Sequence, residues 1–216
     1  GARIVLVDTM IDSFEIDYDA VAAAITKDTK AIIPVDLGGR LCDYHRLHEI
    51  TEEKRGLFDG KTSLQKLYDR VILVADSAHG FGAEFKGMKS GRFADFTAFS
   101  FHAVKNLTTG EGGAVVWRAV DGLDDEALYK KFMLLSLHGQ SKDALAKTRL
   151  GSWEYDILFP GHKCNMTDIQ AAIGLKQMER YDTLLARRRE IINKYDEVVL
   201  SQGWKRLIHF DEDNRS

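Results

Sequence analysis

The sequence predicts an α/β fold, in which helices cover a central sheet. Two short apolar runs, at residues 71–75 and 96–101, each end in polar residues, and a third run lies at 114–117. Continuous apolar runs of this length are typical of strands buried on both faces of such a sheet. Because ligands bind beyond the carboxyl ends of these strands, the polar residues after the runs are candidates for a functional site.

The residue pattern in the first part of the chain predicts a strand, a helix and a second strand. Residues 3–7 are expected to form a strand. A helix is expected over 17–25, because Asp17 is a plausible N-cap and early acidic residues suit the helix dipole. Residues 31–35 predict a second strand, placed at an edge or a strand end because Pro34 cannot donate a ladder hydrogen bond.

The segments before the first apolar run predict a turn at 36–39 and a helix over 43–53, in which apolar residues recur at helical spacing. Residues 54–69 are interpreted as a surface elaboration on the path to the next strand. An extra helical turn is expected within this elaboration, at 63–68.

The last third of the chain predicts helices. One is expected over 124–138, where apolar residues share a face. A second is expected over 167–181, with Thr167 as its N-cap and an acidic residue in its first turn. This helix is expected to run on, or to break once, as far as Val199.

Composition limits the class of protein. The chain has 216 residues, of which 44% are hydrophobic, and a formal net charge of −3. This length can bury a real core in one or two domains, and the charge argues against nucleic acid as the main partner. We expect no membrane span, since no apolar run approaches about 20 residues, and no signal peptide. Two cysteines without CxxC spacing favour a reducing cytosol.

The polar residues after the apolar runs are weak signals one by one. Asp76 alone would be a turn or helix cap, Lys105 a surface charge and His79 a structural histidine. The Gly-Thr run at 108–113 alone would be an ordinary loop or hairpin. Their combination at the ends of neighbouring strands favours a site.

Two other patterns favour structural roles. His45 and His48 are three residues apart and could share a metal, but no third ligand is evident. Arg187, Arg188 and Arg189 are interpreted as a solvated helix face or as salt-bridge partners, rather than as a nucleic-acid site. We therefore expect no metal site.

Three segments resemble a known family. They are ADSAHGFGA at 75–83, FSFHAVKNLTTGEGGA at 99–114 and PGHKCNMTDIQAAIGLKQMERYD at 160–182, and the opening at 3–39 is also similar. The chain resembles the pyridoxal-phosphate (PLP) sugar aminotransferases of the DegT/DnrJ/StrS group, within the type I aspartate-aminotransferase fold class. The most specific part is an Asp-x-x-His block followed by Ser-Phe-x-x-x-Lys-Asn.

The resemblance implies a cofactor site for pyridoxal 5'-phosphate. Lys105 would be the catalytic residue, since a primary amine must hold the cofactor aldehyde as a Schiff base. Asp76 would keep the pyridine nitrogen protonated. Small Ala78 would let the ring lie close to the backbone, His79 would contact the side with the ring hydroxyl, and Ser100 would bind the phosphate.

The loop at 161–165 matches a segment that crosses to the partner subunit in relatives. Lys163 and Asn165 are the candidates for binding the cofactor phosphate there, which implies a homodimer with shared active sites. The alternative is that both residues merely cap the following helix. His162 and Cys164 stand where relatives commonly have aromatic residues, so the contacts to substrate are open.

The resemblance also implies a domain organisation. It predicts a PLP-binding large domain over 1–185, with a mostly parallel central sheet, and a connecting helix with the start of a small domain over 186–216. Relatives have an N-terminal helix and turn before this stretch and a completed small domain after it. The chain is therefore expected to be the central part of a longer protein.

The function implied is amino transfer from an amino acid, glutamate first, to a keto sugar that is linked to a nucleotide. A cyclitol aminotransferase, a PLP-dependent deoxysugar dehydratase and a non-catalytic protein of the same fold are the alternatives. Dehydratases of this group commonly carry His where this chain has Lys105. The sugar, the nucleotide and the ring position are not determined by the sequence.

Overall fold

The computed structural model of the chain describes residues 1–141, 154–206, 208, 211 and 213–215. The chain divides into two compact units, one comprising Gly1–Arg118 and Gln170–Ser216 and the other Ala119–Ile169. The first unit contains the central sheet. The described part of the second contains a helix and the loops that pair with its end.

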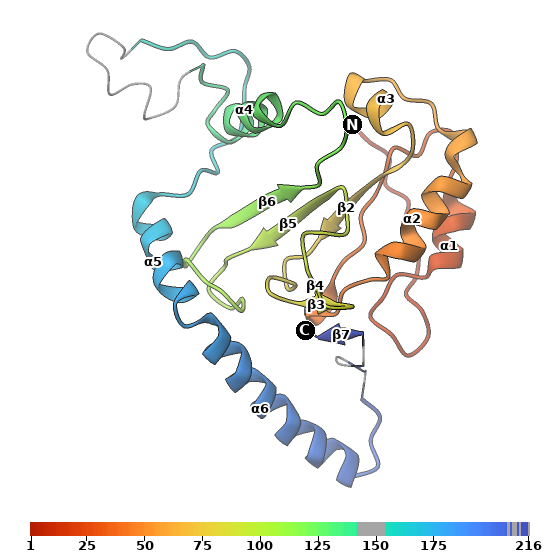
Figure 1. Cartoon of the computed structure of the whole chain (residues 1–216), viewed down its shortest axis with the longest axis vertical. Helices are drawn as coiled ribbons and strands as arrows, with labels where there is room; N and C mark the ends of the chain where they lie inside the picture. Colours follow the sequence, from red (N-terminus) through yellow and green to blue (C-terminus); the bar gives the residue numbers. More distant parts are fainter. Residues whose placement is uncertain (142–153, 207, 209–210, 212, 216) are drawn as a thin grey trace. The chain divides into compact units, whose positions relative to one another are not determined.

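The central sheet is mixed and mostly parallel (Figure 1). Its strands are β1 (Ala31–Ile32), β2 (Ile72–Asp76), β5 (Phe96–Ser100) and β6 (Gly113–Trp117). They are ordered β1-β2-β5-β6; the first three are parallel, and β6 runs antiparallel to β5. The α/β class and the three predicted strands are confirmed, but only β2 and β5 are largely buried, whereas β6 is an edge strand in which Val115 and Val116 are exposed.

The strand β1 is shorter than the predicted 31–35 and lies at the edge of the sheet, as its proline indicated. Pro34 accepts a hydrogen bond from Asp76 N at 2.9 Å but has no N–H to give back. Pairing resumes two residues later, where Asp36 N donates to Asp76 O at 2.9 Å. The chain from β1 thus stays beside β2 up to its carboxyl end.

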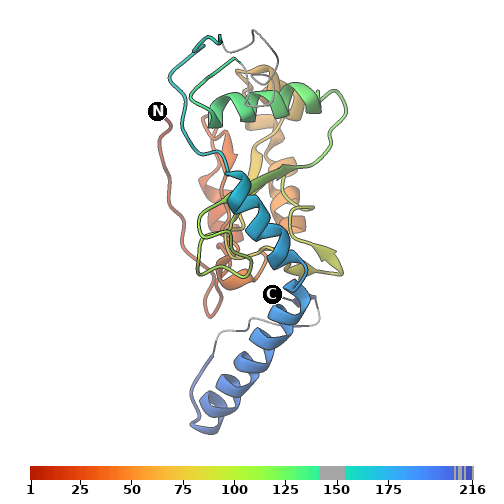
Figure 2. The same ribbon diagram turned by 90° about the vertical axis from the view of Figure 1, so that its left-hand side faces the viewer.

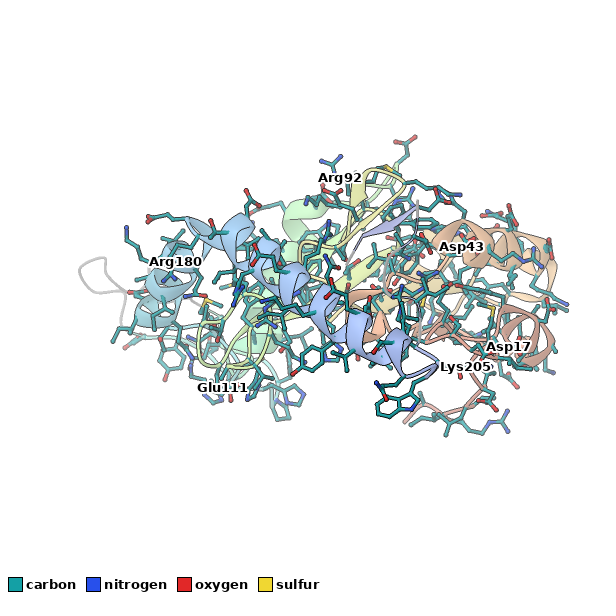
Figure 3. All side chains as sticks on the ribbon, turned by 90° about the horizontal axis from the view of Figure 1, so that it is seen from below. Asp17, Asp43, Arg92, Glu111, Arg180 and Lys205 are labelled. Carbon is teal, nitrogen blue, oxygen red and sulfur yellow. The ribbon has the colours of Figure 1, made fainter. Side chains whose placement is uncertain are left out.

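The helices α1 (Tyr18–Ala24) and α2 (Tyr44–Glu53) begin where the sequence predicted. Their N-caps are Asp17 and Asp43, whose carboxylates each accept a backbone N–H from the first turn (Figure 3). Such a cap contributes about 1 kcal/mol, because it satisfies a donor that the helix itself leaves unpaired.

The main core lies between these helices and the sheet. The helix α2 contacts β2, and α1 contacts α2. The side chains that fill the space are almost wholly buried: Val21, Ile25, Leu47, Ile50, Leu73 and Phe93. Burial of each aliphatic side chain contributes roughly 1.5 to 3 kcal/mol, so this face anchors the β2 strand firmly.

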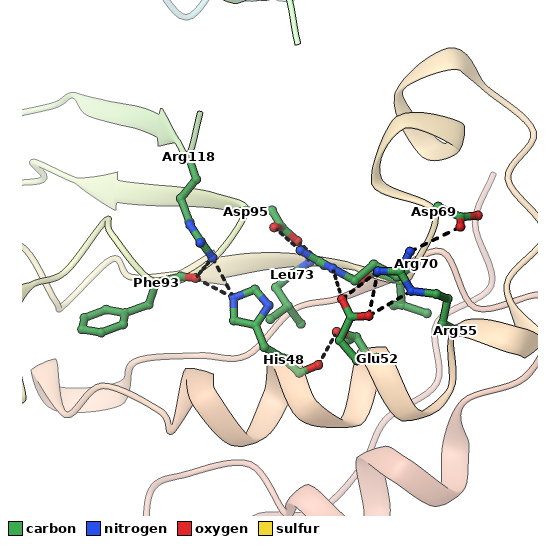
Figure 4. Close-up of polar contacts among 11 residues, drawn as sticks. His48, Glu52, Arg55, Asp69, Arg70, Leu73, Phe93, Asp95 and Arg118 are labelled. Carbon is green, nitrogen blue, oxygen red and sulfur yellow. Dashed lines mark hydrogen bonds and ion pairs between the residues drawn. The ribbon is translucent and has the colours of Figure 1, made fainter. Parts of the chain in front are cut away.

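A buried ion pair fixes the start of β2 (Figure 4). Asp95 is 1% exposed and accepts hydrogen bonds from two nitrogens of Arg70, at 2.7 and 2.8 Å, and from Leu73 N at 2.8 Å. On its outer side Arg70 lies 3.3 Å from Glu52, which also binds Arg55. The pair links α2, β2 and the turn before β5.

Most of the remaining elements are short. They are η1 (Leu37–Gly39), η2 (Arg55–Leu57), α3 (Ser63–Tyr68), β3 (Glu84–Phe85), β4 (Met88–Lys89), β7 (Asn214–Arg215), α5 (Asp168–Met178) and α6 (Tyr181–Ser201). The strands β4, β3 and β7 form a small antiparallel sheet. The helical turn predicted at 63–68 is confirmed as α3.

The helix predicted from residue 167 breaks once, which is one of the two outcomes expected from the sequence. Figure 2 shows the break between α5 and α6, and Arg180, labelled in Figure 3, lies at it. The predicted helix over 124–138 is α4 (Asp125–Ser136), which lies in the second unit and is capped by Asp124.

The strand predicted at 3–7 is wrong. These residues have no regular secondary structure, and Ile4 and Leu6 are 82% and 88% exposed. An apolar run becomes a strand only where a neighbour supplies ladder hydrogen bonds, and nothing in the described chain pairs with this segment. Among the described residues, no helix combines the length and apolar character that a membrane span requires.

Candidate functional site

The carboxyl end of β2 carries Asp76. This residue lies opposite Ala98 of β5, and Ser77 N donates to Ala98 O at 2.9 Å, so the end of the strand is held within the sheet. The Asp76 carboxylate is half-buried and accepts a hydrogen bond from Ala78 N at 3.2 Å. It therefore fixes the turn that follows the strand, while part of the group faces outward.

The turn after β2 is tight and needs a glycine. Gly80 N donates to Ser77 O at 2.8 Å, and the Ser77 hydroxyl is buried 2.8 Å from that of Ser90. A Cβ atom at Gly80 would lie 2.2 Å from Ser77 Oγ, which is too close for any side chain. The turn places Ala78 and His79 just beyond the carboxyl end of β2.

Two charged side chains of opposite sign act on the imidazole of His79. Its Nδ1 accepts a hydrogen bond from Gly38 N at 3.1 Å. Partial burial lowers the pKa of His79, the Lys105 ammonium lowers it further, and the Asp76 carboxylate acts in the opposite direction. Burial and the Lys105 charge thus favour the neutral imidazole.

The carboxyl end of β5 leads into the loop that carries Lys105. Ser100 is the last residue of the strand, and its Oγ accepts from His102 N at 3.3 Å. The loop turns back through Lys105, whose N–H donates to His102 O at 3.0 Å, and returns into β6. Glu111, labelled in Figure 3, lies on this loop with its carboxylate 3.6 Å from His102 Nε2.

The helix α6 is attached to both site loops. The Tyr181 hydroxyl donates to Phe81 O, just after the turn that carries His79. About two helical turns further along α6, the guanidinium of Arg188 lies 3.5 Å from Lys105 O. The aromatic ring of Phe81 also packs edge-on against Phe99 of β5. These contacts hold the two loops against one support.

Most of the candidate residues from the sequence therefore lie at the carboxyl end of the two central strands. Asp76, Ala78 and His79 follow β2, and Ser100 and Lys105 follow its parallel neighbour β5. A carboxylate, an imidazole, a hydroxyl and a primary amine are thus presented together. Their individual roles remain predictions.

Lys163 and Asn165 lie in the second unit. Lys163 pairs with Leu137 in an antiparallel bridge just after α4, and its side chain is exposed. The Oδ1 atom of Asn165 is buried and has no hydrogen-bond partner among the described residues. The structure places both on a loop bound to the end of α4, and their roles toward a partner subunit also remain predictions.

The histidines of α2 have structural contacts. His48 Nε2 lies 2.7 Å from Phe93 O, and the His45 ring packs against Phe85 and Phe93. Within the described part of the chain, no three His, Cys, Asp or Glu side chains are grouped as metal ligands would be.

Sequence reasoning missed Asp36 as part of the site's support. Asp36 is 1% exposed and accepts hydrogen bonds from Cys42 N at 3.0 Å and from the Tyr44 hydroxyl at 2.8 Å. Burial raises the pKa of Asp36 to about 6, although the hydrogen bonds from its neighbours oppose the shift. The Asp-Leu-Gly-Gly run after a predicted strand was the available signal, and it was interpreted only as a turn.

Comparison with known proteins identifies the relatives of this chain. Residues 1–215 match the DegT/DnrJ/EryC1/StrS aminotransferase family. Among solved structures, the PMP form of a putative sugar aminotransferase, Spr1654 from Streptococcus pneumoniae, is 53% identical with a TM-score of 0.92. The match covers 100% of this chain and 54% of that one. The same protein has also been solved in a PLP form.

Two further relatives are more distant. The spore coat polysaccharide biosynthesis protein SpsC of Bacillus subtilis is 39% identical over 90% of this chain and 45% of its own length. The structure of DesI in the presence of its TDP-sugar product is 29% identical, with a TM-score of 0.63, over 86% of this chain and 39% of that one. The chain thus spans about half the length of its relatives.

Proposed function

Because the chain belongs to the DegT/DnrJ/EryC1/StrS aminotransferase family, we propose that its protein is a PLP-dependent aminotransferase that acts on a keto sugar. The observation that carries the proposal is the placement of these groups at the carboxyl ends of two parallel neighbours, with Asp76 and His79 after β2 and Lys105 after β5. Ligands of α/β sheets bind beyond the carboxyl ends of the strands, where a carboxylate and a primary amine on neighbouring strands could bind different parts of one small ring. The family supports the reaction class, and these residues supply the chemistry.

The groups present fit PLP. Asp76 would bind the pyridine nitrogen, His79 the ring oxygen and Lys105 the aldehyde, while Ser100 would donate to the phosphate. Ala78, between Asp76 and His79, adds only a methyl group, so it leaves room for a flat ring. When bound, PLP supplies an aldehyde that carries the amino group and a ring that takes up electrons from the donor.

The chain's own residues would then perform positioning and proton transfer. The Asp76 carboxylate would keep a proton on the ring nitrogen, because a negative charge beside it stabilises the cation. The neutral amine of Lys105 would accept the proton that leaves the α-carbon of the amino donor and hold it as an ammonium. The contacts of α6 with both loops would keep these groups in fixed positions relative to each other.

The identities of the two substrates are the finer part of the proposal. Glutamate is proposed as the donor and a nucleotide-linked keto sugar as the acceptor. The acceptor is supported by DesI, which was solved with a TDP-sugar product. A homodimer, to whose shared sites Lys163 and Asn165 contribute, and a cytosolic setting are proposed with them.

An amino-transfer assay tests the proposed function. The protein with PLP is incubated with glutamate and a panel of 3-keto and 4-keto sugar nucleotides, and 2-oxoglutarate and amino sugar are measured together. We expect both products in equal amounts from at least one acceptor. Loss of the keto sugar without 2-oxoglutarate would indicate dehydration, and no turnover with any acceptor, despite bound PLP, would indicate a binding protein.

A further inference from the structure

The segment from Asp36 to Cys42, which we call the support turn, lies beside His79 and is held from two sides. On its inner side, Asp36 Oδ1 accepts from Cys42 N and from the Tyr44 hydroxyl, so one carboxylate oxygen joins the start of the turn to its end. On its other side, the buried Asn214 amide binds Leu41 twice, donating to its carbonyl at 2.8 Å and accepting from its N–H at 3.3 Å.

The support turn is also tied to the strand that carries the candidate site. Asp36 N donates to Asp76 O at 2.9 Å. Two residues on, Gly38 adopts a left-handed backbone conformation with φ of 66°, which glycine allows at little cost. In this conformation the Gly38 N–H points at His79 and donates to Nδ1 at 3.1 Å.

A backbone N–H can only donate, and this determines the state of the imidazole. An Nδ1 atom that accepts a hydrogen bond cannot carry a proton itself, so the proton of the neutral ring must be on Nε2. A charged ring would bring two N–H groups face to face. Partial burial and the Lys105 ammonium act in the same direction, and Asp76 opposes them.

We propose that the support turn is a positioning element: Gly38 holds His79 as the neutral tautomer with its proton on Nε2, so that this ring can only donate to an oxygen acceptor of the ligand. Asp36 is the positioning residue that keeps the turn closed. The inference rests on the proposed function only for the ligand, in which the acceptor would be the ring oxygen of PLP. The tautomer itself is a property of the protein alone.

The tautomer can be measured without cofactor or activity. The protein is labelled with ¹⁵N-histidine, and long-range proton–nitrogen correlations are recorded near neutral pH, with His79→Gln used to assign the His79 signals. We expect a protonated Nε2 and an unprotonated Nδ1 at His79. A proton on Nδ1, or a charged ring, would overturn the proposal from the unmodified protein alone.

Two variants of Asp36 separate positioning from general stability. Asp36→Asn keeps an oxygen that can accept both hydrogen bonds, so the single tautomer should be retained. Asp36→Ala removes that acceptor, and we expect the His79 signals to change to a mixture of tautomers or to a charged ring. An unchanged His79 pattern in folded Asp36→Ala would contradict the role of Asp36. A protein that shows the expected tautomer but transfers no amino group would refute the proposed function and leave this inference standing.

Discussion

Two carboxylates meet at the carboxyl end of β2, and their surroundings differ. Asp76 is half-buried at the carboxyl end of β2, where a cofactor could reach it. Asp36, whose N–H is bonded to Asp76 O, is 1% exposed, and one of its carboxylate oxygens is bonded to Cys42 and Tyr44. Burial raises the pKa of Asp36, and the negative charge of Asp76 adds to the shift. One group is thus suited to bind a ligand and the other to hold a turn.

The raised pKa of Asp36 predicts a pH dependence of stability. The folded protein holds the proton up to about pH 6, whereas the unfolded chain releases it near the ordinary value of 3.8. Between these values the folded state binds more protons, so the free energy of unfolding should fall as the pH rises, by about 2 to 3 kcal/mol from this group. Urea unfolding across this range measures it.

The Asp36→Asn variant should lose this pH dependence, because its amide keeps the acceptor oxygen without the ionisation. It should therefore be more stable than the unchanged protein above pH 6 and lose that advantage in acid. Asp28→Asn, at an exposed carboxylate, is the matched control and should follow the unchanged protein. Parallel curves for all three proteins would show that Asp36 ionises normally.

At the scale of the elements, a buried ion pair sets the position of β2 relative to α2 and β5. Asp95 receives two hydrogen bonds from Arg70 and one from Leu73, and both charged side chains are largely shielded from water (Figure 4). Removing one member would leave the other charge buried and unpaired, which costs more than the pair itself contributes.

Replacement of Asp95 should therefore be severe. We expect Asp95→Ala to lower the free energy of unfolding by about 3 to 5 kcal/mol. Glu52→Ala removes the exposed partner of the same arginine and should cost less than about 1 kcal/mol. Chemical denaturation of both variants tests the difference. Equal and small losses would mean that the buried pair does not fix β2.

The elements and the site differ in how far the sequence predicts them. The cap Asp17, the helix starts at Asp43 and Asp124 and the three apolar strands follow from local patterns, and the site motif marks Asp76 and Lys105. The sequence could not show that residues 3–7 form no strand, because strand formation depends on a partner elsewhere in the chain.

The support of the site was hidden from the sequence for a related reason. Asp36 and Gly38 lie about forty residues before His79, and only the parallel pairing of the chain beyond β1 with β2 brings them together. A buried carboxylate and a left-handed glycine are consequences of tertiary structure. In the sequence they are indistinguishable from an ordinary turn.

At the scale of the whole molecule, the chain holds a sheet unit with the candidate site and a second unit with the loop of Lys163 and Asn165. The sheet unit presents the groups that would bind the ring of a cofactor. The other unit presents a buried amide oxygen without a partner among the described residues. A dimer in which this loop completes the partner's site would bring such groups together.

Subunit mixing tests this arrangement in the full-length protein. Lys105→Ala and Asn165→Ala each place one defect in every site of their own homodimers. In mixed dimers, one site receives both defects and the other receives neither. After denaturation and refolding together, we expect activity to recover toward roughly a quarter of the sites. Activity that stays at the mean of the two variants would show that each site is built from one chain.

The central claim is that Lys105 holds the cofactor aldehyde opposite Asp76, and borohydride reduction tests it most directly. The protein is incubated with PLP, reduced, digested and analysed by mass spectrometry. We predict one phosphopyridoxyl group, on the peptide that contains Lys105, and its absence in Lys105→Ala, with Lys89→Ala as the control at an exposed lysine. A phosphopyridoxyl group on another lysine, or the same labelling in Lys105→Ala, would contradict the account.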